Sequence, residues 1–481
     1  YFQEGRSDKV YEVDLCEVVS DQYVVNFRYG RRGTALRDGT KTPAPVSQAK
    51  AAQIFDDLVK SKTDKGYRHS DAGASPPSPA ATPPTTTATV PVTDPRARGV
   101  LTRINAGTDL ISPFKLSRAV WRAGEMRLKE AEPALHKLLG AGDAQLDYCI
   151  AWALGRLGSA SSAPGLRSLQ SSRNHSYMVR RIAAVSLLEL LDDEARQKAI
   201  DGYIAQLPKT LAELARSGPA DSFESALNEH LQDADPSAYA TLDVAYIINN
   251  SHVRPALLNL ARNCPLAPNY FQRIRHIFKA AELRGDAEMF GILARRFETT
   301  RGNINMKSWS FWSYQRNPKE NPLLGPHASA AYSHATRFYL RRRVWRTLKR
   351  LGELGMAEDY VRLATGVLVA ITDDDAAQPY RSVTYRYERG RYHQVSVQYD
   401  RLHPFWAVGN ILFGKSRRYQ FENSGRRVRY YRQMDTPAAT PTEREEAFPQ
   451  LWDKVPQALL HLLDESRCLE VHQFAAKALR A

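Results

Sequence analysis

The residues best suited to hold a phosphate group lie in one short run near the amino terminus. The run reads Phe27, Arg28, Tyr29, Gly30, Arg31, Arg32 and Gly33. Because the two glycines lack side chains, the backbone can turn tightly there and let a phosphate reach amide and guanidinium groups together. Two more cations, Lys62 and Lys65, precede Tyr67 further along the chain. Cations set beside flat rings predict a site for a polyanion.

The surrounding sequence predicts a small sheet and a helix that position this run. Residues 10–15 and 23–29 alternate apolar and polar side chains, which is typical of half-buried strands, and Ser20-Asp21 between them favours a turn. Ser47 is a suitable N-cap for a helix over residues 48–61. The apolar residues expected to pack that helix on the sheet are Ala51, Ala52, Ile54, Phe55, Leu58 and Val59.

The same segment resembles the WGR domain, the DNA-end-sensing module of poly(ADP-ribose) polymerases that also opens bacterial MolR-type proteins. The resemblance covers residues 1–68 and includes a matching first strand. The residues that carry this part of it are Phe2, Glu4, Gly5, Ser7, Lys9, Val10, Tyr11, Glu12 and Val13. One position departs from the family, because Tyr29 stands where the family has tryptophan. The resemblance implies an antiparallel sheet with one helix.

The resemblance also implies roles for individual residues. Tyr29, followed by Gly30, would stack near the terminal sugar at a DNA break, and Arg31 would hold the adjacent phosphate. Arg32 is also expected to contact DNA, although it occupies a position that is usually apolar in the family. Lys62 and Lys65 match a closing basic motif that would hold backbone phosphates. Without the family pattern, an ordinary edge-strand tyrosine and a solvated hairpin tip would be the better interpretation.

Length, charge and cysteines narrow the class of protein. A chain of 481 residues is too long for one core and should form two to four domains. The net charge is +15, and residues 301–432 hold 24 Lys and Arg against 10 Asp and Glu. Arginines interleaved with aromatic residues favour nucleic acid as the partner of this stretch.

No run of eighteen apolar residues occurs, so no membrane span is expected. Four widely separated cysteines predict a reducing compartment and no structural metal. A cytoplasmic, nucleoid-associated location would follow from DNA binding.

A linker and a helical repeat follow the first module. Residues 69–98 are rich in proline, alanine and threonine, which predicts a disordered linker. Beyond it a pattern repeats after 31 residues, and each unit reads as a helix, a turn and a second helix opened by proline. We therefore predict a HEAT-like α-solenoid over residues 99–379, with both tryptophans as packing residues. The repeated positions are Trp121, Gly124, Pro133 and Leu138, then Trp152, Gly155, Pro164 and Leu169.

Residues 380–432 lack the helical pattern and instead alternate along the chain, with many basic and aromatic residues. This predicts two basic β-hairpins inserted into the helical region. Strand-like alternation surrounds a turn at residues 389–391, and a second candidate hairpin runs from 418 to 432. Residues 433–481 predict a helical repeat that ends on an unpaired helix at 471–481, which leaves open that the chain is part of a longer protein. The arginines expected to contact DNA phosphates are Arg389, Arg391, Arg417, Arg418, Arg426, Arg427 and Arg429.

Enzyme signatures are missing from the sequence. It contains no phosphate-binding loop with Gly-Lys-Ser/Thr, no nucleophile elbow, no His-Glu-x-x-His and no dinucleotide fingerprint. Asp373, Asp374 and Asp375 could bind a cation, but a solvated cluster at a helix end is the favoured interpretation. The aromatic-rich segment 309–314 could stack on bases or pack on the helices. We expect no catalytic residue, no metal and no cofactor.

The leading hypothesis is a non-catalytic, bacterial DNA-binding protein that acts in regulation, repair or phage defence. Its first module would sense DNA, with ends or breaks as candidate targets, and the basic hairpins would hold the backbone. Two alternatives stay open. One is a HEAT-like DNA glycosylase of the AlkD type, for which the sequence offers no convincing pair of a carboxylate and an aromatic residue. The other is a protein-interaction scaffold, with protein partners on the solenoid.

Overall fold

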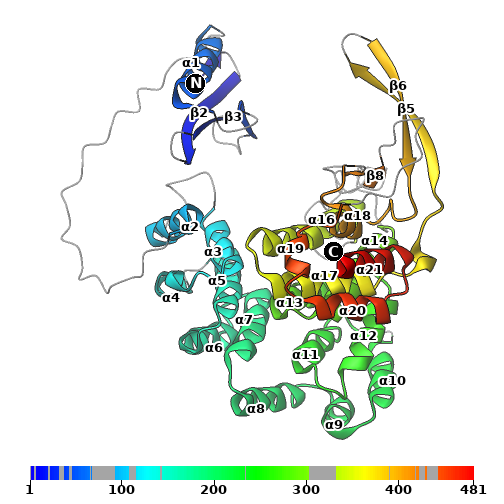
Figure 1. Ribbon diagram of the computed structural model, residues 1–481. Helices are drawn as coiled ribbons and strands as arrows, with labels where there is room; N and C mark the ends of the chain where they lie inside the picture. Colours follow the sequence, from blue (N-terminus) through cyan, green and yellow to red (C-terminus); the bar gives the residue numbers. More distant parts are fainter. Residues whose placement is uncertain are drawn as a thin grey trace, which may run out of the picture. The chain divides into compact units, whose positions relative to one another are not determined.

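The computed structural model divides into two compact units, Tyr1–Ala88 and Thr89–Ala481, which are treated separately (Figure 1). Helices predominate, and each unit contains one four-stranded sheet. The residues that the structure describes are 2–4, 7–19, 22–31, 37–42, 46–64, 67, 93–107, 115–140, 143–232, 234–302, 332–388, 391–417, 419–421, 428–430 and 443–481.

The amino-terminal unit is an antiparallel sheet in the order β1-β2-β3-β4. Its strands β2 and β3 pair along most of their length, with Tyr11 opposite Tyr29 and Leu15 opposite Val25. The predicted strands are confirmed, although both extend beyond the predicted ends. The strands are β1 (Phe2–Glu4), β2 (Ser7–Val19), β3 (Gln22–Arg31) and β4 (Arg37–Thr40).

One helix, α1 (Gln48–Thr63), packs on this sheet. It begins after Ser47, as predicted, but the Ser47 side chain makes no capping hydrogen bond. Val25, Ala51 and Leu58 form the buried core, and the predicted residues Ile54 and Phe55 pack against it. Among the residues described, these buried side chains make a small core, as expected for a module of this size.

The second unit is mostly helical. The short 3₁₀ turns are η2 (Lys129–Ala131), η3 (Ala160–Ser162) and η5 (Asp373–Asp375). Its helices up to residue 300 are α2 (Pro95–Ala106), α3 (Leu116–Glu125), α4 (Glu132–Leu138), α5 (Ala144–Leu157), α6 (Ala163–Ser171), α7 (Tyr177–Leu190), α8 (Asp193–Ile204), α9 (Lys209–Ser217), α10 (Ala220–Leu231), α11 (Ala240–Ile248), α12 (Arg254–Asn263), α13 (Pro268–Arg284) and α14 (Ala287–Thr299). The later helices are α16 (His334–Glu353), α17 (Ala357–Val369), α18 (Trp406–Phe413), α19 (Pro449–Trp452), α20 (Pro456–Glu465) and α21 (Leu469–Arg480).

The helical unit begins earlier than the sequence predicts. Residues 69–98 were assigned to the linker, but α2 starts at Pro95. Asp94 caps it by accepting a hydrogen bond of 2.8 Å from the Arg96 backbone amide. Asp followed by proline at the first helical position is a strong start signal, which the composition of the neighbouring linker obscured.

The predicted repeat corresponds to three consecutive helix pairs, α3/α4, α5/α6 and α7/α8. Helix α5 packs between α3 and α7. A Cβ atom on Gly124 would lie 2.6 Å from a ring carbon of Trp152, and one on Gly155 would lie 2.5 Å from the Ser186 hydroxyl. The repeated glycine is therefore the position at which each first helix closely approaches the next one. Because each tryptophan lies three residues before such a glycine, both residues recur after the same 31 residues.

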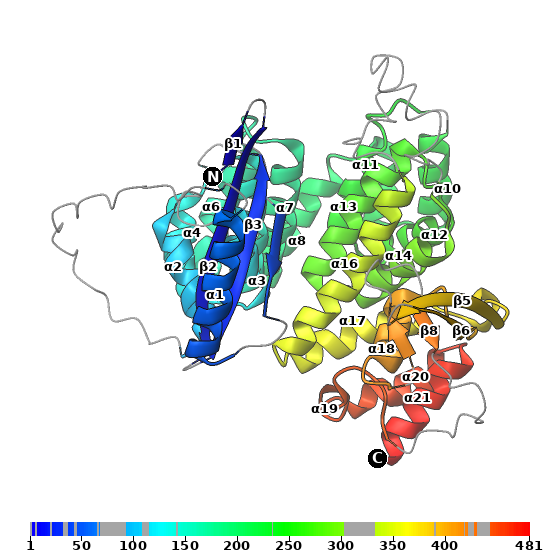
Figure 2. The same ribbon diagram turned by 90° about the horizontal axis from the view of Figure 1, so that it is seen from above.

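Later helices of the unit also pack against α5 and α7. Helix α13 contacts both of them, and α11 contacts α7. Figure 2 shows α13 beside α16 and α14 in the same unit. Buried Asp243 on α11 lies 2.7 Å from Nε of Arg181 on α7 and 3.1 Å from Nη1 of Arg273 on α13. Burial alone would raise the pKa of Asp243, but the cations around it lower that pKa.

Helices α14 and α17 cross at two glycines. A Cβ atom on Gly291 would lie 1.9 Å from the carbonyl oxygen of Gly366, and one on Gly366 would lie 2.0 Å from that of Ala287. Only residues without a side chain allow the two backbones to approach this closely. The crossing joins the middle of the unit to its carboxy-terminal helices, because α17 also packs against α20.

Both predicted hairpins form and combine into one sheet of order β5-β6-β8-β7. Its strands are β5 (Tyr380–Glu388), β6 (Arg391–Tyr399), β7 (Tyr419–Phe421) and β8 (Val428–Tyr430). The β5–β6 hairpin projects from the helices as an arm (Figure 1). Interpreting 380–432 as hairpins alone was wrong, because the buried helix α18 separates them.

The carboxy-terminal helices also differ from the prediction. The segment 471–481 was expected to be the opening helix of another repeat, with no partner after it. In the structure it belongs to α21, which instead packs as the second helix of a pair against the preceding α20. Val471 and Ala475 are fully buried in the main core. In the described part of the chain, no helix combines the length and the apolar character that crossing a membrane requires.

Candidate nucleic-acid interface

The amino-terminal unit carries a ladder of aromatic rings, made of Tyr11 on β2 and of Phe27 and Tyr29 on β3. The ring centroids of Tyr11 and Tyr29 lie 6.0 Å apart, those of Tyr11 and Phe27 lie 5.6 Å apart, and both pairs are stacked. Val25 in the middle of β3 is fully buried, whereas Tyr29 near its end is 41% exposed. The ladder therefore runs from the core out to solvent and ends at Tyr29.

Cations and a further ring border this ladder. Nζ of Lys62, in the last turn of α1, lies 4.0 Å from the centroid of the Tyr11 ring. The Tyr67 ring meets Tyr11 edge-on at 6.2 Å. Burial, followed by the proximity of Tyr29 and Tyr67, raises the pKa of Tyr11, which keeps that hydroxyl protonated at neutral pH. A cation above a ring is the arrangement expected of a cation–π contact.

The other predicted residues of this unit lie at or beyond the end of β3. Gly30 and Arg31 are its last two residues and pair with Val10 and Lys9 of β2. Arg32 and Lys65 lie outside the described residues. The structure thus brings Tyr29, Lys62 and the end of β3 into one unit, as the sequence predicts.

Tyr11 and Phe27 were not singled out as site residues. They become part of the ladder because Tyr11 lies opposite Tyr29, and Val13 lies opposite Phe27. Aromatic residues two apart on a strand share a face, so positions 27 and 29 could have indicated the ladder from the sequence. Tyr11 could not be included without the strand register.

On the helical unit, two of the predicted arginines can be placed fully. Arg391 opens β6 and is exposed, and Arg417 is exposed immediately before β7. Arg429 lies in β8, opposite Gln420. The predicted residues that lie outside the described part are Arg389, Arg418, Arg426 and Arg427.

Some of the arginines predicted to form a basic surface are instead engaged inside the protein. On α16, Arg341 pairs with Glu298, and both side chains are 2% exposed. Arg343 pairs with Glu282 at 2.6 Å. Arg337 donates to the backbone carbonyl of Phe297 at 2.9 Å. These arginines hold helices together, so counting charges along the chain overstates the basic surface.

The structure does contain a carboxylate beside an aromatic pair, although the sequence offered no convincing one. Nε1 of Trp121 donates to Glu125 at 3.1 Å, and burial raises the pKa of Glu125. However, the ring of Trp121 stacks at 3.6 Å on Trp152, and the guanidinium of Arg343 lies 5.3 Å from its centroid. Because the ring is covered by Trp152 and Arg343, these groups fit helix packing better than the stacking of a flipped base.

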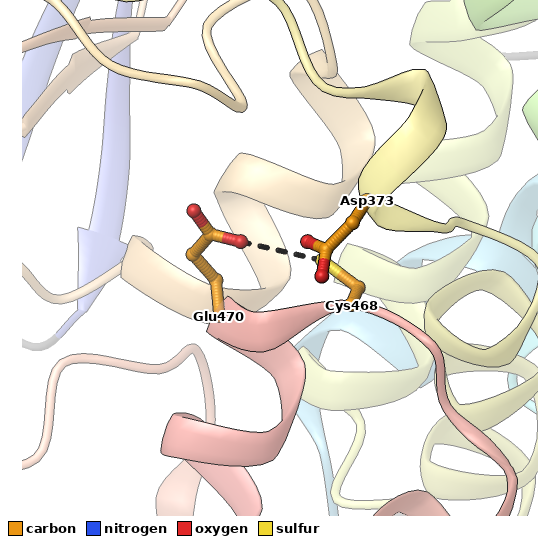
Figure 3. Close-up of side chains that lie close together, drawn as sticks. All are labelled: Asp373, Cys468 and Glu470. Carbon is orange, nitrogen blue, oxygen red and sulfur yellow. Dashed lines mark hydrogen bonds between the residues drawn. The ribbon is translucent and has the colours of Figure 1, made fainter.

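Asp373, Cys468 and Glu470 form the candidate cation cluster of the described residues (Figure 3). Arg401 already supplies a cation, at 2.7 Å from Asp373 and 3.5 Å from Glu470. Burial raises the pKa of the Cys468 thiol to about 11, so it stays protonated near neutral pH. The neighbouring Asp375 pairs with Arg295 at 2.6 Å. The cluster is an ion-pair network that ties α21 to the base of the arm, rather than a purely solvated helix end.

The aromatic-rich segment 309–314 lies outside the described residues. The cysteines that can be placed are all free and buried, namely Cys149, Cys264 and Cys468.

Comparison with known proteins supports the interpretation of the first unit. No curated protein and no solved structure matches the chain. Residues 2–74 match the family model of the WGR domain, a nucleic-acid-binding module of the poly(ADP-ribose) polymerase and MolR family.

Proposed function

We propose that this chain is a DNA-binding protein without catalytic activity of its own, in which the WGR domain makes the primary contact. The observation that carries the proposal is the ring ladder that ends at solvent-exposed Tyr29, inside the segment that matches the WGR family model. An exposed ring at the end of a ladder that Lys62 borders suits a strand end, where a sugar or base is unstacked.

In this proposal Tyr29 stacks against the terminal sugar or base at a DNA end or break. Gly30 leaves room for the strand, and Arg31 and Arg32 hold the adjacent phosphates. Lys62 and Lys65 hold phosphates further along the backbone. Because Lys62 already lies over Tyr11, its ammonium group is positioned at the border of the ladder.

The helical unit, proposed as a HEAT-like solenoid, supplies a second surface through its projecting arm. Exposed Arg391 and Arg417 support this role, which would extend to the neighbouring arginines of both hairpins. Two weak sites on one chain raise the apparent affinity through effective concentration. The setting would be the bacterial cytoplasm, at the nucleoid, in regulation, repair or phage defence.

A titration of fluorescent blunt, nicked and closed duplexes tests this proposal. The wild-type chain is expected to prefer ends or nicks, and Tyr29→Ala combined with Arg31→Ala should abolish that preference. Arg391→Ala combined with Arg417→Ala should lower the salt dependence of binding to all three duplexes by about one to two phosphate contacts. Exposed Arg167 on α6 supplies the matched control, because Arg167→Ala removes a charge outside both surfaces. Identical curves for all four proteins would refute the proposal.

A protein-interaction scaffold is the second candidate. Leucines lie exposed on the last two helices, with Leu460 on α20 at 56% and Leu469 on α21 at 47%. Exposed apolar side chains of this kind mark protein contacts more often than nucleic-acid contacts. Binding to a protein partner that is insensitive to salt, together with no measurable DNA binding, would favour this candidate.

A further inference from the structure

A cleft of about 710 Å³ lies in the helical unit, at the crossing of α14 and α17. Residues of α12, α14, α17 and α20 line it. Clefts of this size, with an apolar lining and a few polar groups, are typical of sites for small molecules. The apolar part of this lining is made of Ala287, Ile292, Gly366, Val369 and Ala370.

A buried hydroxyl group in the lining lacks a hydrogen-bond partner. Thr365 on α17 is 8% exposed, and its Oγ1 makes no hydrogen bond to any residue that the structure describes. A threonine inside a helix commonly donates such a bond to a carbonyl of the preceding turn. Because an unpaired buried hydroxyl costs stability, a ligand that forms a hydrogen bond with Thr365 would remove that cost.

Two arginines of the lining are available to a ligand. Arg262 on α12 lies 3.4 Å from Glu288, and the same carboxylate also binds Arg254 at 3.0 Å. Exposed ion pairs of this kind contribute little to stability, so Arg262 can turn toward a ligand at small cost while Arg254 keeps Glu288 paired. Exposed Arg467, which follows α20, forms no ion pair with any described residue.

The other charged side chains of the lining set a limit on the charge of the ligand. Arg295 on α14 is engaged by Asp375 at 2.6 Å. Glu465 on α20 lines the cleft and has no ion-pair partner within the described ranges. Exposed His461 lies one turn before it on the same helix. Because Glu465 repels negative charge, the lining favours a ligand with a single anionic group over a polyanion such as a nucleic-acid strand.

We propose that this cleft binds a small organic molecule that carries one anionic group, a carboxylate or a phosphate, on an apolar body. Arg262 and Arg467 contact the anionic group, and the forked guanidinium suits both kinds of anion. The apolar body lies over Ile292 and Val369, and a polar group of the ligand reaches Thr365. The site belongs to the helical unit, and the proposal does not depend on DNA binding by residues 2–74.

Calorimetric titration of the full chain with matched probes tests this proposal. The probes are 4-hydroxybenzoate, 4-nitrophenyl phosphate, inorganic phosphate and the uncharged 4-hydroxybenzyl alcohol. We expect one of the two anionic aromatic probes to bind at least 10-fold more tightly than inorganic phosphate and than the alcohol. The tighter of the two identifies the anion as a carboxylate or a phosphate. The proposal is wrong if neither of them binds, or if the alcohol binds as tightly as they do.

Arg467→Met tests the contact with the anionic group, because methionine keeps an unbranched apolar chain and carries no charge. We expect it to weaken binding of the tighter probe roughly 10- to 100-fold, the effect of losing a charge-assisted hydrogen bond. Arg467→Lys should give an intermediate affinity, since lysine keeps the charge but not the fork. Arg167→Met removes an exposed arginine of α6 outside the cleft and is the matched control. Equal affinities for the wild type and Arg467→Met would overturn the proposal.

Thr365→Val separates a binding role of this residue from a structural one. Valine keeps the shape and removes a hydroxyl that has no partner in the free protein, so the melting temperature without ligand should not fall. Affinity for the tighter probe should fall roughly 2- to 10-fold, the effect of losing one neutral hydrogen bond. An unchanged affinity, whatever the melting temperature, would contradict the proposed contact.

Two further variants serve as controls for this measurement. Ser186→Ala removes another buried hydroxyl that has no partner among the described residues and does not line the cleft. It should leave probe affinity unchanged. Tyr29→Ala should also leave probe affinity unchanged, so failure of this proposal is distinguishable from failure of the proposed DNA-end contact.

Discussion

Each unit of this protein contains stacked aromatic rings with a cation near one ring, but the two clusters differ in their access to solvent. In the amino-terminal unit, Tyr11 and Tyr29 stack with centroids 6.0 Å apart, and Lys62 lies over Tyr11. In the helical unit, Trp121 and Trp152 stack with centroids 3.6 Å apart, and Arg343 lies near Trp121.

Exposure separates a packing role from a binding role in these clusters. Tyr29 is 41% exposed, whereas Trp152 is 3% exposed. Gly124 allows the helix of Trp121 to approach Trp152, and Arg343 is held in place by Glu282. An aromatic residue near a cation is therefore weak evidence for a ligand until one face of the ring is shown to be accessible.

Shortening Trp152, in the stacked tryptophan pair of the helical unit, should have the largest effect on stability. Trp152→Ala is expected to lower the free energy of unfolding of the helical unit by about 3–5 kcal/mol, because it removes a large buried ring and leaves a cavity. Urea unfolding followed by circular dichroism measures this loss. DNA end preference at low temperature should be unchanged. A loss of end preference in the folded variant would show that the tryptophan pair also binds DNA.

Adding a side chain at Gly124 tests how tightly the tryptophan pair is packed. Gly124→Ala should cost about 1–3 kcal/mol, because the added Cβ would overlap the Trp152 ring and the Ala153 backbone. Gly99→Ala in α2 is the matched control, since nothing lies within 4 Å of that position and alanine is the better helix former. Thermal unfolding of both variants gives the comparison. Equal stability of the two would mean that the helices can separate without cost.

The smallest effect on stability and on DNA affinity is expected at solvent-exposed Tyr29. Tyr29→Phe keeps the ring and removes only the hydroxyl, so both stability and affinity for DNA ends should change by less than about 0.5 kcal/mol. Tyr29→Ala should weaken end binding by about 1–3 kcal/mol, the contribution of one stacked base. Fluorescence anisotropy with a blunt duplex measures both changes. If phenylalanine proved as damaging as alanine, the hydroxyl rather than the ring would make the contact.

The elements that local patterns specify could be predicted from the sequence. Strands β2 and β3, helix α1 and the three helix pairs follow from alternation, capping and the repeated glycine. Helix α18 was missed because its eight residues lie between two strongly alternating hairpins. The pairing of α21 with α20 was missed because a short helix gives no sign of which neighbour it packs against.

The surface charge was predicted less well, for a physical reason. Arg341 and Glu298 are 43 residues apart, and Arg343 and Glu282 are 61 residues apart. Long-range pairs of this kind depend on how helices pack, and local composition does not specify that packing. The ring ladder was predicted only in part, because the place of Tyr11 in it requires the register of two strands.

The ion pairs of Arg401 give the arm a mechanical connection. Arg401 follows β6 and joins Asp373 to Glu470 of α21, and Tyr419 of β7 donates to the neighbouring Asp400 at 2.6 Å. The foot of the arm and the last helix therefore share charged side chains, so a change at Arg401 would alter the surroundings of both.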